Sequence, residues 1–213
     1  MIELYKGLSP VVTVIMVTYN RAGYLDRSIG SYLEQSYKDT ELLVIDDGST
    51  DHTFEVVLKY MKDHDNIRYI RHSNRNISLS KNVGLKAAAG RYVTFLDSDD
   101  ALKPDYLESR VKFMEMHPNL DIIEGGAIII GDPYVKDRNN PKRLIHLSEC
   151  HIGATYFGKT EVFLAAGGYD KATTYSEDSE FWTKVEKQFN TGKIDHPGYI
   201  YYRDTPGSVC NSM

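Results

Sequence analysis

Cysteine is scarce in this sequence, and so are long runs of apolar residues. The 213 residues include two cysteines, Cys150 and Cys210, whose spacing matches no zinc-binding pattern. This scarcity favours a reducing, cytoplasmic compartment and leaves a single disulfide open. The apolar stretch over residues 11–17 is interrupted by Thr13 and is far shorter than the roughly 20 residues that span a bilayer. We therefore expect no transmembrane segment and no secretory signal.

An excess of positive charge is absent as well. The chain has 25 lysine and arginine residues against 30 aspartate and glutamate residues, which gives a formal net charge of -5. Nucleic acids and anionic membranes therefore gain no general electrostatic attraction, and we expect no nucleic-acid partner. Any phosphate group has to be bound by local contacts.

Apolar residues are nevertheless sufficient for one hydrophobic core. They make up 41% of the chain, and aromatic residues make up 11%. A chain of this length lies near the upper end of a single domain. We therefore expect one domain over residues 1–213, without internal repeats.

Short apolar segments alternate with segments of helical periodicity. This alternation predicts an α/β fold with a mostly parallel central sheet flanked by helices. The expected strands cover residues 11–17, 41–45, 67–70, 92–96 and 127–130, and the expected helices cover residues 25–33, 54–61, 79–89, 104–116 and 160–166. A last helix begins near Glu177, and residues 131–143 are predicted to form an exposed, mobile loop.

Polar clusters follow three of the predicted strands. They are Thr18 to Arg21, the "DDGSTD" segment from Asp46 to Asp51, and the "DSDD" segment from Asp97 to Asp100. Ligands of open α/β sheets bind at the carboxyl ends of the strands, so the clusters should converge on one edge of the sheet. The same residue types also form ordinary turns and helix caps, which is the competing interpretation.

The "DSDD" segment is the strongest candidate for a metal site. Closely packed carboxylates repel one another unless a cation or solvent relieves them. Carboxylates spaced as Asp97 and Asp99 suit Mg²⁺ or Mn²⁺, which takes one or two carboxylates together with substrate phosphates. Such an ion neutralises a diphosphate leaving group.

A second candidate lies in the segment "SEDSEFW". On a helix that begins near Glu177, Asp178 shares a face with Phe181, Trp182 and Val185, so it should point toward the edge of the core. It is either a first-turn charge that the helix dipole favours or a general base. The helix terminus lowers the pKa of such a carboxyl and burial raises it, and the sequence leaves the balance open.

With these residues in view, the chain resembles the family-2 glycosyltransferases, which have a GT-A fold and invert the configuration of the transferred sugar. The resemblance spans roughly residues 10–203. It depends on the ordered motifs "VIMVTYNR", "LLVIDDGSTD", "NVGLKAAAGRYVTFLDSDD", "GGYD" and "SEDSEFW". It implies a nucleotide-sugar-binding half over residues 10–100 and a smaller acceptor-side half over residues 101–213, with the possibility of C-terminal truncation.

The resemblance also implies a role for each matching residue. Tyr19 would lie against the base, beside Thr18, and Asp47 would hydrogen-bond the base of a UDP-linked donor. Asp97 would contact the ribose, Asp99 would bind Mn²⁺ or Mg²⁺, and Asp178 would act as the base. Arg21, Lys81 and Ser98 complete the donor site. Two departures from the family pattern are Lys81, where arginine is common, and the lack of a histidine shortly after Tyr202 and Arg203.

Two other functions remain open. A nucleotidyltransferase usually has a glycine-rich loop after its first strand, whereas "TYNRAGY" contains a single glycine. A non-catalytic domain that binds nucleotide sugars or glycans would keep Tyr19 and Asp47 without needing Asp178. For a transferase, the expected acceptor is a glycan or a lipid-linked glycan, which would place the protein at the inner face of a membrane.

Overall fold

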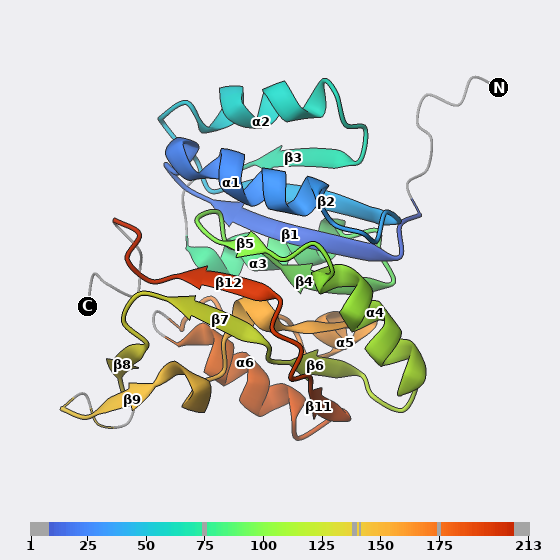
Figure 1. Cartoon of the computed structure of the whole chain (residues 1–213), viewed down its shortest axis with the longest axis vertical. Coiled ribbons are helices and arrows are strands. Elements are labelled where there is room, and N and C mark those ends of the chain that lie inside the picture. Colours follow the sequence, from blue (N-terminus) through green and yellow to red (C-terminus); the bar gives the residue numbers. More distant parts are fainter. Residues whose placement is uncertain (1–8, 74–75, 138–139, 141, 174–175, 207–213) are drawn as a thin grey trace.

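A seven-stranded sheet runs through the middle of the chain and carries helices on both faces (Figure 1). The computed structural model describes residues 9–73, 76–137, 140, 142–173 and 176–206. The strand order is β11-β6-β10-β4-β1-β2-β3. The strands of this sheet are β1 (Val12–Thr18), β2 (Thr40–Asp46), β3 (Ile67–Arg71), β4 (Tyr92–Phe95), β6 (Ile122–Glu124), β10 (Phe157–Lys159) and β11 (Thr191–Lys193).

The direction of the strands confirms the predicted mostly parallel sheet. Strand β1 pairs in parallel with β2 and β4, and β2 pairs in parallel with β3. Strand β10 runs antiparallel to both of its neighbours, β4 and β6. Because two reversals restore the direction, β6 runs parallel to β4, and their carboxyl ends lie at the same edge of the sheet.

Side-chain alternation along the strands divides the core into two layers. Val14 and Met16 point to one face of β1, and Ile15 points to the other. The first face packs on α1 (Ala22–Leu33), α2 (Thr53–Met61) and α4 (Tyr106–Met116). The second packs on α3 (Ile77–Ala87), α5 (Thr160–Ala165) and α6 (Glu177–Val185). All six expected helices are present, although Pro104 precedes the N-cap Asp105 of α4 instead of lying in its first turn.

A smaller sheet is built from the second half of the chain. Strand β12 (Tyr199–Tyr202) lies between β5 (Ala101–Leu102), which is antiparallel to it, and the predicted strand β7 (Ala127–Ile130), which is parallel to it. Figure 1 shows β12 and β7 side by side below β5. Because β5 follows β4 in the chain, this pairing brings β12 against the segment after β4.

The prediction of an exposed, mobile loop over residues 131–143 is wrong where a strand forms within it. Strands β8 (Tyr134–Lys136) and β9 (Leu144–His146) form an antiparallel hairpin. Its turn is closed by the N–H of Asp137, which donates to the carbonyl of Arg143 at 2.9 Å. The turn residues suggested a loop, but backbone pairing of the short apolar segments beside them offsets that tendency. Two 3₁₀ turns follow, η1 (Leu147–Glu149) and η2 (Gly153–Thr155).

Two expectations from the sequence concern membranes and cysteines. Within the described part of the chain, no helix has the length and apolar character needed to cross a membrane. Cys150 forms no disulfide with another described residue, and Cys210 lies outside the described residues, so the disulfide question stays untested.

Candidate active site

The turns after β1, β2 and β4 lie side by side at the carboxyl edge of the sheet. Thr18 is in register with Asp46, and the N–H of Asp47 donates to the Thr18 carbonyl at 2.9 Å. On the other side of β1, the N–H of Leu96 donates to the Ile15 carbonyl at 3.0 Å, which carries the acidic turn to the same edge. The three polar clusters identified in the sequence therefore share one edge.

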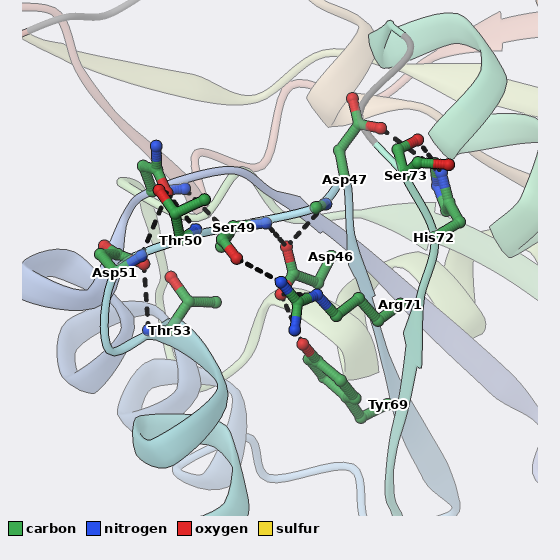
Figure 2. A network of polar contacts seen from close by, with 12 residues as sticks. Asp46, Asp47, Ser49, Thr50, Asp51, Thr53, Tyr69, Arg71, His72 and Ser73 are labelled. Atoms are coloured by element: carbon green, nitrogen blue, oxygen red, sulfur yellow. Dashed lines mark hydrogen bonds and ion pairs between the residues drawn. The ribbon is translucent and has the colours of Figure 1, made fainter.

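Asp46 holds the turn after β2 and is not available to a ligand. It is fully buried, and its Oδ1 accepts from the N–H groups of Gly48 and Ser49 at 3.1 and 2.7 Å. The hydroxyl of Tyr69 donates to its Oδ2. Figure 2 shows this network below the turn, with Asp47 pointing away from it toward His72. The adjacent aspartates thus have different roles: Asp46 is structural, and Asp47 faces the edge.

Asp47, Thr18 and Tyr19 are the residues expected to bind a nucleobase, and they lie in the turns after β1 and β2. The Asp47 carboxylate is buried, and its Oδ1 lies 3.4 Å from Nδ1 of His72. The Thr18 hydroxyl is buried and has no hydrogen-bond partner among the described residues. Tyr19 is 45% exposed, so part of its side chain is accessible to a ligand. Their arrangement agrees with the expected base pocket, although their contacts with a donor remain a prediction.

The acidic turn after β4 is built around Asp100. Its buried carboxylate accepts from the Tyr199 hydroxyl at 2.7 Å and from the Tyr202 N–H at 2.8 Å. Burial, reinforced by the charge of Asp97, raises the pKa of Asp100 to about 8. The carbonyl of Ser98 accepts from the Ser28 hydroxyl at 2.7 Å, which ties the turn to α1. Asp100 and Ser98 therefore support the turn, and a ligand contact of the Ser98 side chain remains a prediction.

Asp97 and Asp99 in the same turn are partly exposed. Burial raises the pKa of Asp97 to about 7, although the Lys81 ammonium opposes this shift and the charges of Asp99 and Asp178 add to it. Burial also raises the pKa of Asp99, with Arg21 and Arg27 acting in the opposite direction. Arg21 itself donates to the Pro206 carbonyl at 2.8 Å. The mutual influence of these charges shows that they share one electrostatic environment.

Lys81 connects the donor side of this edge with α6. Its side chain is 5% exposed, and its Nζ lies 2.7 Å from Asp178 Oδ1 and 3.0 Å from Glu177 Oε1. Burial opposes the charged form, but Asp178 and Glu177 hold the pKa of Lys81 well above its usual range. The ammonium is thus occupied by two carboxylates, and the expected contact with phosphate remains a prediction.

Asp178 lies in the first turn of α6 and points toward the site, as the helical spacing indicates. Its Oδ2 accepts from the N–H of Gly153 at 3.2 Å, and its side chain is 26% exposed. Burial raises the pKa of Asp178, and the opposing charge of Lys81 does not cancel the effect of burial. Burial thus makes this carboxylate more basic than an ordinary aspartate.

The residues present fit a divalent ion that is shared with a substrate. Among the residues that the structure describes, no three His, Cys, Asp or Glu side chains are grouped to hold an ion by themselves. Two partly buried carboxylates with raised pKa values, Asp97 and Asp99, follow β4. Mg²⁺ and related ions commonly take one or two carboxylates and fill their remaining positions with phosphate oxygens and water. Asp99 would hold such an ion, which would neutralise the charge of a bound diphosphate.

Three residues at this edge were not identified from the sequence. Glu177 is the second carboxylate on Lys81, and an oxygen of Glu124 lies 2.7 Å from Nδ1 of His151. Glu124 ends a short apolar strand and precedes two glycines, which is the kind of signal that identified Asp47. His151 carries no such signal, because its place depends on contacts between distant segments.

Comparison with known proteins decides the family of this chain. The family described as "Glycosyl transferase family 2" matches residues 13–164, well over half of the sequence. The chain belongs to glycosyl transferase family 2. A curated relative, glycosyltransferase GlyA of Streptococcus pneumoniae, is 30% identical over 202 residues, which cover 89% of this chain and 27% of that protein. The predicted family is therefore confirmed.

Solved structures confirm the GT-A type of fold for this family-2 domain. S. aureus TarS 1-349 in complex with UDP-GlcNAc superposes with a TM-score of 0.79 at 22% identity and covers 95% of this chain. The mannosyltransferase PcManGT from Pyrobaculum calidifontis, in complex with GDP-Man and Mn²⁺, gives 0.73 at 23% identity and covers 94%. This chain spans 61% and 59% of those two chains. All three similar proteins are therefore longer than the segment they share with it.

Proposed function

We propose that this family-2 domain transfers a sugar from a UDP-linked donor to an acceptor hydroxyl with inversion, and that the reaction depends on Mn²⁺ or Mg²⁺. Residues 10–100 supply the donor half and residues 101–213 supply the acceptor half. The observation that carries the proposal is the position of Asp178. Its carboxylate has a raised pKa, remains partly exposed, and interacts electrostatically with Asp97 of the acidic turn.

Donor binding follows from the side chains at the edge. Tyr19 stacks on the base, and Asp47 accepts a hydrogen bond from the imide N–H of uracil. The buried Thr18 hydroxyl, which lacks a partner among the described residues, gains one from the nucleotide. Asp97 contacts the ribose, while Asp99 holds the ion; when bound, that ion neutralises the charge that develops on the departing diphosphate.

The acceptor is activated on the opposite side of the donor sugar. Asp178 takes the proton of the attacking hydroxyl, and its raised pKa makes it a better base than an ordinary aspartate. Lys81 holds the carboxylate in place and compensates part of its charge. Because one base and one leaving-group site suffice for a single displacement, no covalent intermediate with the protein is needed. A glycan or a lipid-linked glycan is the proposed acceptor, and a lipid-linked one would place the reaction at the inner face of a membrane.

The replacement Asp178→Asn tests this function. We expect transfer to fall about 100-fold or more, because general-base catalysis contributes at least that much. Binding of UDP with Mn²⁺, measured by titration calorimetry, should stay within about 2-fold, since the change is nearly isosteric. Asp63→Asn, an exposed aspartate outside the site, is the matched control and should change neither quantity.

Each contrary outcome has a clear meaning. Transfer that survives in the Asp178→Asn variant would show that Asp178 is not the base. A wild-type protein that binds nucleotide sugars but transfers nothing to any acceptor would favour the non-catalytic alternative. Release of pyrophosphate from a nucleoside triphosphate and a sugar phosphate would instead identify a nucleotidyltransferase.

A further inference from the structure

A carboxylate–imidazole pair stands on the acceptor side of the site and has no part in the function proposed above. Nδ1 of His151 lies 2.7 Å from Oε2 of Glu124. The Glu124 side chain is 5% exposed and the His151 side chain is 35% exposed, so the pair is buried at one end and open at the other. The other Glu124 oxygen, Oε1, lies 3.4 Å from Nζ of Lys193, which leaves both carboxylate oxygens occupied.

The sheet places Glu124 at the same edge as the acidic turn. Strand β6 is parallel to β4 and is separated from it by β10. The residue partners across the three strands are Ile123, Phe157 and Thr94. Glu124 follows Ile123 in β6, and Phe95 follows Thr94 in β4. Glu124 therefore lies level with Phe95, close to the start of the "DSDD" segment. A charged, buried residue at this level faces the ligand edge of the sheet.

Contacts with α6 place His151 beside Asp178. The imidazole stacks on the Trp182 ring, with ring centroids 5.4 Å apart and an angle of 25° between the planes. Trp182 is one helical turn after Asp178 and lies on the same face of α6. Two residues after His151, the N–H of Gly153 donates to Asp178 Oδ2. The segment over residues 151–153 therefore lies against the Asp178 carboxylate and the first turns of α6.

The chemistry of the pair suits recognition of a sugar hydroxyl. A carboxylate that accepts from Nδ1–H fixes both the tautomer and the orientation of an imidazole. The second nitrogen, Nε2, then carries a lone pair at the partly exposed end of the ring. Stacking on Trp182 stops the ring from turning, so the direction of this acceptor is set before any ligand arrives.

Building on the function proposed above, we propose that His151, held by Glu124 and Trp182, accepts a hydrogen bond from an acceptor-sugar hydroxyl next to the one that reacts. His151 is thereby a positioning residue for the acceptor, and it sets which sugar is used. Glu124 is buried and affects acceptor binding only by orienting the imidazole. Neither residue contacts the nucleotide.

Kinetics of the His151→Ala variant test this inference. The donor probes are UDP-glucose, UDP-galactose and UDP-GlcNAc, and the acceptor probes are the p-nitrophenyl glycosides of glucose, galactose and N-acetylglucosamine. For the donor and acceptor that react fastest, we expect the KM for the glycoside to rise about 5- to 10-fold. This change corresponds to the loss of one hydrogen bond. Hydrolysis of the donor by water and the affinity for UDP should stay unchanged.

Two further variants separate positioning from folding. Glu124→Gln keeps an oxygen that accepts from Nδ1–H, so the KM for the glycoside should rise by less than in His151→Ala. His196→Ala removes a similar pair, in which Nε2 lies 2.9 Å from Oδ2 of Asp105, and should leave the KM for the glycoside unchanged. Equal effects of the two histidine variants would overturn the inference, as would a rise in the KM for the donor alone.

The design also distinguishes this inference from the proposed function. If the wild-type protein transfers sugar and His151→Ala does so with the same KM for the glycoside, only the inference fails. If the wild-type protein transfers to none of the glycosides, NMR follows the ring signals of its histidines with UDP and Mn²⁺ present. The signal that is missing from the spectrum of the His151→Ala variant belongs to His151. A shift of that signal on addition of a glycoside supports the inference, and the absence of any shift overturns it.

Discussion

At the scale of single residues, burial governs the chemistry of the carboxyl groups. The pKa values of Asp97, Asp100 and Asp178 are all raised, and burial is the largest cause in each case. At Asp51, burial also raises the pKa, but hydrogen bonds from the Thr53 side chain and from backbone N–H groups together outweigh it, so the pKa is lowered. Residues of one type thus differ in basicity according to their surroundings.

The raised pKa of Asp97 predicts a pH-dependent loss of stability in the metal-free protein. Because the folded state binds this proton more tightly than the unfolded chain, the stabilising effect is complete below about pH 4 and is lost as the pH rises through about 7. Asp97→Asn removes this titration. In EDTA, the unfolding free energy of the variant should rise relative to that of the wild type between pH 5 and pH 8, by at most about 1.4 kcal/mol for each pH unit. Its melting temperature should rise relative to that of the wild type over the same range.

Thermal unfolding of both proteins across this range is the measurement. Both proteins are measured with the same buffer ions and at the same ionic strength. A constant difference between the two melting temperatures over the whole range would contradict the assigned shift.

At the scale of elements, the site depends on the close approach of η2 to α6. A Cβ atom added to Gly153 would lie 2.0 Å from Cγ of Asp178, which is far inside van der Waals contact. Gly153 is therefore required because a carboxylate occupies the space of a side chain. The N–H of the same residue holds that carboxylate, so the approach also supplies a hydrogen bond.

Gly153→Ala should displace Asp178 and reduce transfer about 10- to 100-fold while the protein still folds, because small misplacements of reacting groups are costly. Gly30→Ala is the matched control, since an added Cβ there meets nothing within 4 Å. It should leave activity unchanged and stabilise α1 slightly. Activity assays and melting curves for both variants provide the check, and a fully active Gly153→Ala protein would show that the carboxylate can shift without loss.

At the scale of the whole molecule, the donor site is assembled from strands that are neighbours in space. Strands β4, β1 and β2 are adjacent in the sheet, although β4 follows β1 by about 80 residues in the sequence. Strand β12, near the end of the described chain, clamps Asp100 through Tyr199 and Tyr202. Ligand binding should therefore stabilise the folded state as a whole.

Nucleotide and metal together should raise the melting temperature. At a UDP concentration about 100 times the dissociation constant, the gain is about 2.7 kcal/mol, or about 5–10 °C for a protein of this size. Removing Mn²⁺ with EDTA, or replacing Asp99 by Asn, should abolish most of the shift. The screen is differential scanning fluorimetry with UDP, GDP and CDP, and an equal response to UDP with and without Mn²⁺ would argue against the proposed metal dependence.

The sequence by itself determined the fold class, the three polar clusters and the family, because hydrophobic periodicity and motifs that follow strands are local properties of the chain. It did not reveal that Lys81 lies between Glu177 and Asp178, nor that β8 pairs with β9. Only the tertiary structure brought Glu124 and His151 beside Asp178. The pairing of β6 through an antiparallel strand and the packing of η2 on α6 are long-range contacts, and no local pattern encodes which distant segments meet.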